Sequence, residues 1–166
     1  PDDSSEPKVM KEGDCGEYLK WVLMSNGVVT ISGTGKMVDV DVLSHKQSWF
    51  TTYADDITQV VIEEGVTTVG SYAFDMCVNL ESVKLPNSLI EIHQDAFKGC
   101  EKLWDITIPS GVTKIMGSAF NGCKSLVAIE IPDSTITVAS GAFGNSEKKQ
   151  KVTLPNTLSC INSSTF

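Results

Sequence analysis

The sequence predicts an α/β solenoid, because short motifs recur along most of its 166 residues at a constant interval. The dipeptide Ala-Phe appears four times, and each copy follows the previous one by 23 residues. Prolines and cysteines keep the same interval, with no insertion between copies. A period of roughly 20 to 50 residues is typical of repeat proteins in which each unit packs on its neighbours. The three series are Ala73-Phe74, Ala96-Phe97, Ala119-Phe120 and Ala142-Phe143; Pro86, Pro109, Pro132 and Pro155; and Cys77, Cys100 and Cys123.

Each repeat is predicted to begin with a strand, because β-branched and aliphatic residues alternate there with polar ones. Such strands stack side by side as a parallel sheet, and the proline that follows them ends the strand. A second apolar pair and the Ala-Phe pair then point inward. A column of Gly99, Gly122 and Asn145 tolerates a left-handed backbone, which predicts that a short helical turn ends there. The inward strand positions are Val60, Ile62, Val83, Leu85, Ile106, Ile108, Ile129, Ile131, Val152 and Leu154.

Three segments are expected along the chain. Residues 1–14 are mostly polar and predict a flexible leader. Residues 15–56 predict a small N-terminal β cap, because alternating apolar residues flank the turn at 25–27 as in a β-hairpin. Residues 57–166 hold the repeats, and the last repeat is incomplete. The apolar end left there is a candidate surface for self-association.

Two features near the cap allow more than one interpretation. The cluster of Trp49, Phe50 and Tyr53 is compatible with a carbohydrate-stacking platform, although packing of the cap is the more common use of large aromatics. The segment Gly33-Thr34-Gly35 lacks the remaining residues of a phosphate-binding loop, so turn glycines explain it better.

Composition excludes several classes of partner. The net charge is −8 and the pI is near 4.7, whereas binding to nucleic acid or anionic membranes needs a clustered basic face. No apolar run approaches the roughly 20 residues that span a bilayer, so this segment is not expected to insert into a membrane. No Cys or His cluster has zinc spacing, and neither a metal nor a cofactor is expected.

The repeat cysteines are predicted to be free, buried thiols, because Cys is a small apolar side chain that is often fully buried. Stacked strands lie about 4.8 Å apart, so a disulfide between neighbouring repeats is the alternative, although parallel side-chain vectors disfavour it. Cys15 and Cys160 lie outside this repeat series.

The repeat pattern Leu-x-x-Ile-x-Ile-Pro-x-x-Val-x-x-Ile-x-x-x-Ala-Phe-x-Gly-Cys resembles the BspA-type leucine-rich repeat of bacterial and protozoan surface proteins. The resemblance covers residues 57–166, and residues 15–37 are similar to a segment that often precedes such repeats in secreted proteins of gut bacteria. It implies a right-handed array with a parallel sheet on the concave side and short helical turns on the convex side. It also implies export to the cell surface and a role in adhesion or host-protein binding, but it transfers no binding residue.

The outward strand positions predict a binding face on the concave sheet. Trp104 has the apolar Val127 and Ala128 as neighbours in the predicted sheet, and an exposed apolar patch around a Trp is typical of an interface anchor. The alternative is that Trp104 packs on a neighbouring side chain and binds nothing. The candidate binding residues are Trp104, Val127, Ala128, Asp105, Thr107, Lys84 and Glu130.

Catalysis is not expected, because the sequence shows few convergent reactive groups. His45 and His93 are the two histidines of the sequence, and His93 is predicted to be an exposed bystander, because the same position in other repeats holds Gly70, Met116 and Ala139. No nucleophile elbow is present, and the acidic pairs, such as Glu63 with Glu64, lack calcium-loop spacing.

The sequence therefore favours a non-catalytic cell-surface or secreted module that binds a protein or glycan through its concave sheet. The alternative is a spacer or targeting module of a larger exported enzyme or adhesin. An enzyme that uses acidic residues on the concave face is a more remote third hypothesis.

Overall fold

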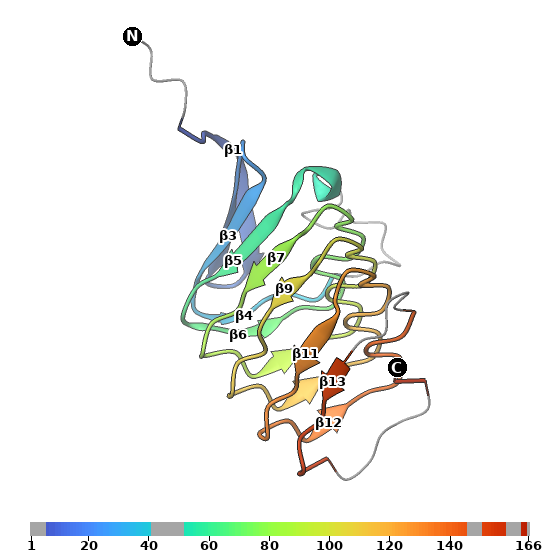
Figure 1. Cartoon of the computed structure of the whole chain (residues 1–166). Helices are drawn as coiled ribbons and strands as arrows, with labels where there is room; N and C mark the ends of the chain where they lie inside the picture. The colour runs from blue at the N-terminus through green and yellow to red at the C-terminus, as the bar shows by residue number, and fades with distance from the viewer. Residues whose placement is uncertain (1–5, 41–51, 146–150, 159–163, 166) are drawn as a thin grey trace.

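The 23-residue repeats form successive turns of a solenoid in the computed structural model, which describes residues 6–40, 52–145, 151–158 and 164–165 (Figure 1). The first strands of successive repeats are β5 (Gln59–Ile62), β7 (Ser82–Lys84) and β9 (Asp105–Ile106). They pair in parallel and in register, with Val60 beside Val83 and Val83 beside Ile106. They belong to a six-stranded sheet with the order β1-β2-β3-β5-β7-β9, here called sheet I. The predicted solenoid of parallel strands is thus confirmed.

A second sheet runs along the solenoid, in the order β12-β10-β8-β6-β4, and is here called sheet II. Its strands are β4 (Gly35–Lys36), β6 (Val66–Val69), β8 (Glu91–Ile92), β10 (Lys114–Ile115) and β12 (Thr137–Val138). The sequence shows these segments only as a second apolar pair, because most of the strands are two residues long and leave no room for visible alternation. Each repeat therefore contributes two strands to the fold.

The first strands of the fourth and fifth repeats, β11 and β13, form a separate pair. β11 (Ala128–Glu130) lies parallel to β13 (Lys151–Thr153), with Ala128 beside Lys151 and Glu130 beside Thr153. This pair is not part of the six-stranded order of sheet I, although the repeat interval from β9 to β11 is unchanged.

The predicted hairpin of the cap is confirmed by the antiparallel strands β2 (Leu19–Met24) and β3 (Val28–Gly33), in which Trp21 lies opposite Ile31. β3 then pairs in parallel with β5, so the hairpin extends sheet I and forms its first parallel neighbour. A short 3-10 helix at Ala54–Asp56 precedes β5. Of the aromatic cluster, Trp49 and Phe50 lie outside the described residues, and Tyr53 packs partly buried against the core.

The leader assigned to residues 1–14 needs correction, because strand β1 spans Val9–Gly16 and pairs antiparallel with β2. Most of its side chains are exposed, and only Cys15 is buried. β1 is therefore an edge strand held by backbone hydrogen bonds, and it lacks the alternating apolar residues by which a strand is recognised from sequence.

The interior contains an aligned column of phenylalanine rings. The centroid of the Phe97 ring lies 5.3 Å from that of Phe74 and 5.4 Å from that of Phe120. The Phe120 and Phe143 rings continue the stack at 5.4 Å, and all four side chains are buried. The prediction that these rings fill the interior of successive repeats is confirmed.

The prediction of short helical turns on the convex side is wrong, because the described chain is almost entirely strand and turn. The predicted α/β class is wrong for the same reason. At these turns alternate N–H groups donate to the next repeat: Phe74 to Ala96 O and Phe97 to Ala119 O, both at 2.8 Å. The intervening N–H groups close tight turns within the repeat. An α-helix would need those donors for bonds four residues back along its own chain.

Left-handed residues at both ends of each turn explain its shortness. Gly99, Gly122 and Asn145 have the predicted positive φ, and Met76 at the same position has φ 59°. A second column with positive φ lies four residues earlier and holds Tyr72, Asp95, Ser118 and Gly141. Only three residues separate the two columns, which is too few for a helix.

The repeat cysteines are free and buried, as predicted. The thiols of Cys100 and Cys123 lie 3.3 and 3.2 Å from the carbonyl oxygens of Phe74 and Phe97. Burial raises the pKa of Cys77 and Cys123 to about 12. Cys15 is also a free, buried thiol, whereas Cys160 lies outside the described residues.

Candidate binding face on sheet I

The predicted binding residues all lie on the outer surface of sheet I and of the adjacent β11–β13 pair. Lys84 is in β7, Asp105 in β9, and Ala128 and Glu130 are in β11. Trp104 and Val127 immediately precede β9 and β11, and Thr107 follows β9. The side chains of all seven are exposed because the inward positions of the same strands hold the core residues.

Trp104 is the largest exposed side chain of this face. It is 60% exposed, and Val127, at the same position of the next repeat, is 50% exposed. Two large apolar groups that remain accessible at adjacent repeats leave apolar surface that a ligand can cover.

Two shallow grooves lie on the same face. One, of about 340 Å³, is bordered by Gln59, Ser82, Lys84, Asp105 and Thr107. The other, of about 500 Å³, extends from β9 across β11 to β13, and Thr107 borders both grooves. The lining of the larger groove consists of Ile106, Thr107, Ile108, Ser110, Ala128, Ile129, Glu130, Pro132, Lys151 and Thr153.

The described charged side chains of this face are not paired with one another. Within the described part of the chain, Lys84, Asp105 and Glu130 form no ion pair with another side chain. An ammonium group, two carboxylates, the Thr107 hydroxyl and the Trp104 indole thus lie on one surface. This mixture suits recognition by hydrogen bonds and stacking.

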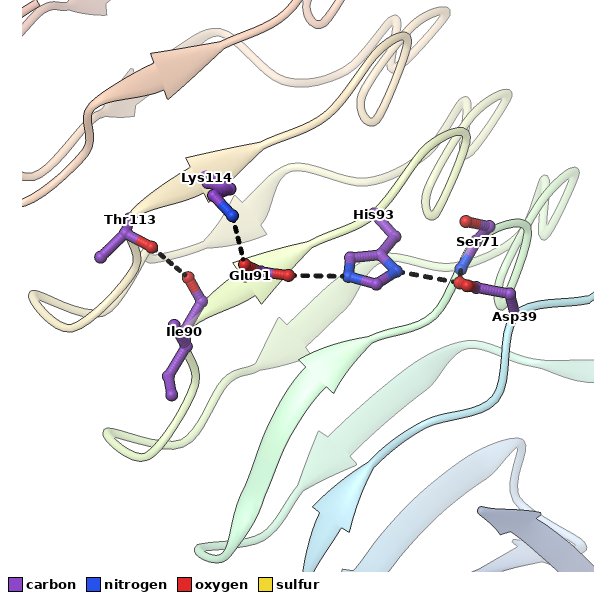
Figure 2. Close-up of polar contacts among 7 residues, drawn as sticks. All are labelled: Asp39, Ser71, Ile90, Glu91, His93, Thr113 and Lys114. Carbon is purple, nitrogen blue, oxygen red and sulfur yellow. Dashed lines mark hydrogen bonds and ion pairs between the residues drawn. The ribbon is translucent and has the colours of Figure 1, made fainter.

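A second polar cluster lies on sheet II, where His93 links the cap to the repeats (Figure 2). Its Nδ1 lies 2.9 Å from Asp39 Oδ1, and its Nε2 lies 3.1 Å from Glu91 Oε2. Lys114 Nζ lies 2.9 Å from the other oxygen of Glu91, and the Ser71 N–H donates to Asp39 at 2.6 Å. The prediction that His93 is an exposed bystander is wrong, because its side chain is 23% exposed and bridges two carboxylates. His45 lies outside the described residues.

The carboxylates of this cluster titrate below their ordinary range. Partial desolvation raises the pKa of Asp39, but the hydrogen bonds from Ser71 and His93 outweigh it and lower the pKa overall. Hydrogen bonds from Lys114 and then His93 lower the pKa of Glu91. Opposite charges within hydrogen-bond distance favour the ionised carboxylate, so the cluster connects neighbouring segments electrostatically.

Glu64, a member of one of the acidic pairs in the sequence, organises the loop of the next repeat. Its carboxylate accepts hydrogen bonds from the Asn87 N–H at 2.8 Å and the Ser88 N–H at 3.1 Å. These bonds lower the pKa of Glu64, the Asn87 bond contributing most. Within the described part of the chain, no group of three or more His, Cys, Asp or Glu residues is arranged to hold a metal ion.

The repeats place the chain in a family. Residues 46–166 match the BspA-type leucine-rich repeat region in six copies. The chain therefore belongs to the BspA-type leucine-rich repeat family, as the resemblance in the sequence suggested. Among curated proteins, none matches the sequence.

Solved structures of bacterial leucine-rich repeat proteins share the fold. A leucine-rich repeat protein from Eubacterium ventriosum is 24% identical, with a TM-score of 0.67 over 89% of this chain and 44% of that one. A leucine-rich cell surface protein from Faecalibacterium prausnitzii is 26% identical, with a TM-score of 0.63 over 93% of this chain and 45% of that one. A protein from Bacteroides ovatus is 22% identical, with a TM-score of 0.66 over 86% of this chain and 41% of that one. This chain thus spans less than half the length of these relatives.

The described residues contain no helix that is both long and apolar enough to cross a bilayer.

Proposed function

We propose that the chain is a non-catalytic binding module, secreted or displayed at the cell surface, that recognises a protein or glycan through the outer face of sheet I. The observation that carries the proposal is the exposure of Trp104 and Val127 beside two grooves whose polar side chains have no ion-pair partners among the described residues. A binding hot spot usually contains an aromatic side chain that becomes buried when the partner binds and is surrounded by polar contacts.

The surface location is supported by kinship. The protein from Faecalibacterium prausnitzii is described as a cell surface protein, and the repeat family is the one to which this chain belongs. Leucine-rich repeats form broad surfaces that suit recognition of large ligands.

The proposal is tested by replacing Trp104 with Ala and measuring capture of the protein on arrays of immobilised extracellular matrix proteins and glycans. The expected result is a loss of about thirtyfold or more in affinity, since hot-spot truncation costs about 2 kcal/mol or more. Ile136→Ala is the matched control, because Ile136 is 62% exposed and immediately precedes β12 of sheet II.

Equal capture by the parent chain and the Trp104 variant removes this face as the binding surface. Absence of capture by the parent chain on either array favours the spacer or targeting module instead.

A further inference from the structure

Sheet I is interrupted between the third and fourth repeats. β9 pairs with β7 on one side, and β11 pairs with β13 on the far side, but no pairing joins β9 to β11 among the described residues. On the other side of the solenoid the same two repeats are continuous, because β10 pairs with both β8 and β12. The phenylalanine stack also continues, with Phe120 5.4 Å from both of its neighbours.

Comparison of the same backbone N–H group in three described repeats shows which hydrogen bond is missing. Asp105 and Lys151 hold the same position in their repeats, and each donates its N–H to the carbonyl of the preceding repeat: Asp105 to Glu81 at 3.3 Å and Lys151 to Val127 at 2.9 Å. Ala128 holds that position in β11, yet within the described chain its N–H makes no bond to Trp104. Ile131 donates in the opposite direction, to Thr153 at 3.0 Å. Since amide directions alternate along a strand, Ala128 and Glu130 present their N–H and C=O groups to the interruption.

The interruption is bounded at both ends. Before it, the Ser125 N–H donates to Glu101 O at 3.0 Å, and beyond it, the Ile136 N–H donates to Thr113 O at 2.9 Å. Between these closures lies the groove of about 500 Å³ described above. Ile106, Ile108 and Ile129 border it and are still 8%, 6% and 4% exposed, whereas the ring of Phe97 in the interior is fully covered.

We propose that this interruption is a binding site for a short extended peptide segment of a protein partner, which adds backbone hydrogen bonds to β11. The inference rests on the proposed function and deepens it by naming the partner's chemistry. The complement of an edge that alternates N–H and C=O dipoles is another extended backbone. A glycan has no group that repeats donor and acceptor with the period of a strand.

The side chains around the site define which peptides fit. Trp104 and Val127, both exposed and apolar, flank the beginning of the site, where Lys151 lies beside Ala128, whereas Glu130 and Thr153 border its other end. Ile106 in β9, Ile108 after it and Ile129 in β11 border the groove and would contact apolar side chains on the inward face of the peptide. The preferred segment therefore alternates apolar and polar residues, with an apolar residue at the Trp104 end and a polar or charged one at the Glu130 end.

Amide hydrogen exchange of the intact chain tests the proposal without a mutation. In the free protein, the Ala128 amide is expected to exchange freely, and the Lys151 amide, at the same repeat position, to be protected. The probe is a pool of synthetic unstructured peptides in which apolar and polar residues alternate. Addition of the pool is expected to protect Ala128 and Glu130 and to leave Lys151 unchanged. Protection of Ala128 in the free protein, or no change on addition of peptide, overturns the proposal.

A substitution pair supplies an independent readout. Ala128→Pro removes the N–H that faces the interruption and is expected to weaken peptide binding about fivefold to tenfold, the effect of one lost hydrogen bond. Ala128→Ser keeps that N–H and is expected to bind as the parent chain does. Equal binding by both variants, with Lys151 still protected in each, contradicts pairing through β11. If Trp104→Ala abolishes capture of a ligand while exchange at Ala128 is insensitive to it, only this inference fails and the binding face stands.

Discussion

At the scale of single residues, the phenylalanine column connects the sequence period to stability. Each ring occupies the interior of its repeat and lies parallel to the next, with interplanar angles of 6°, 10° and 2° along the stack. A buried aromatic ring loses contact with water and gains contacts with both neighbours. Phe97 and Phe120 have a ring on each side, so they contribute to two interfaces between repeats.

Truncation of one of these rings is expected to be severely destabilising. Phe97→Ala leaves a cavity between the rings of Phe74 and Phe120 and should lower the free energy of unfolding by about 3–5 kcal/mol. Urea denaturation followed by circular dichroism measures the change. Ile136→Ala, at an exposed position, should change it by no more than about 0.5 kcal/mol. A loss below about 1 kcal/mol for the Phe97 variant would mean that the stack is not a main source of stability.

Two glycines allow the cost of a left-handed backbone to be distinguished from the cost of steric crowding. Gly122 has φ +75°, and a Cβ added there would meet only ordinary contacts at 3.6 Å. Gly122→Ala is therefore expected to destabilise by about 1–2 kcal/mol through the left-handed backbone alone. Gly117 lacks a positive φ, and an added Cβ would lie 3.5 Å from its nearest neighbour. Gly117→Ala should be neutral or stabilise by about 0.4–1 kcal/mol, since it restricts the unfolded chain. Thermal unfolding of both variants tests the pair, and equal destabilisation contradicts the explanation.

Residue identities predicted part of this backbone pattern. Gly99, Gly122 and Asn145 indicated left-handed positions because such residues tolerate them, and the structure confirms all three. The earlier column, with Tyr72 and Asp95 among its members, went unrecognised because its residue types differ from repeat to repeat. At those positions the bonds to the next repeat impose the conformation on side chains that do not favour it.

At the scale of elements, the cluster around His93 connects the segment that follows β4 to strands β8 and β10. Asp39 comes from that segment, Glu91 from β8 and Lys114 from β10. The side chains of the cluster therefore connect three separate stretches of chain, and the Ser71 N–H adds a backbone hydrogen bond to Asp39. The sequence does not indicate the cluster, because Asp39 lies 54 residues from His93 and only the stacking of the chain brings them together, although Glu91, two residues away, shares a face with His93.

The cluster predicts a loss of stability in acid. The folded-state pKa values of Asp39 and Glu91 lie below their ordinary values of about 4. Their contribution is present above those ordinary values and is lost as the pH falls through the lowered pKa values, because the unfolded chain then binds more protons. Urea unfolding over this pH range should show the loss in the parent chain and a smaller loss in His93→Gln. Lys84→Gln, which alters an exposed cation without an ion pair among the described residues, serves as the control and should behave as the parent chain. Identical acid sensitivity in the His93 variant would contradict the assignment.

The elements differed in how well the sequence predicted them. The first strands and the hairpin followed from alternation, because their inward residues, such as Trp21 and Ile31, are large and regularly spaced. The strands of sheet II are too short to show alternation. The turns resemble helical turns in composition, but their N–H groups donate to the next repeat instead of to a helix. Of the candidate site, the outward residues followed from strand period, but the interruption beside Ala128 did not. The repeat interval is the same on both sides of it, so no insertion or deletion marks the place.

At the scale of the whole molecule, the repeats are joined by backbone ladders and by the ring stack rather than by one central core. Each repeat contacts mainly its neighbours, so the loss of one repeat exposes the next. The buried thiols of Cys77, Cys100 and Cys123 mark three consecutive repeats of the interior.

Thiol labelling is therefore expected to report unfolding of the array as one unit. In the native protein at pH 8 the three thiols should resist alkylation, because they are buried and the pKa values of Cys77 and Cys123 are raised to about 12. With increasing urea they should become reactive together, as measured by mass spectrometry of the labelled peptides. Labelling of Cys77 at a urea concentration well below that needed for Cys123 would instead show that the repeats unfold one at a time.

The hydrogen bonds that the phenylalanine N–H groups make to the next repeat are nearly identical along the array. Phe74, Phe97 and Phe120 each donate their N–H to the following repeat at 2.8 Å, to Ala96, Ala119 and Ala142 respectively. Duplication of the gene segment that encodes one 23-residue repeat would therefore create a new junction between repeats with the same hydrogen bonds at these turns. The length of such a protein can thus change in whole steps during evolution, while the surface chemistry of each added step varies independently of the joints that hold it.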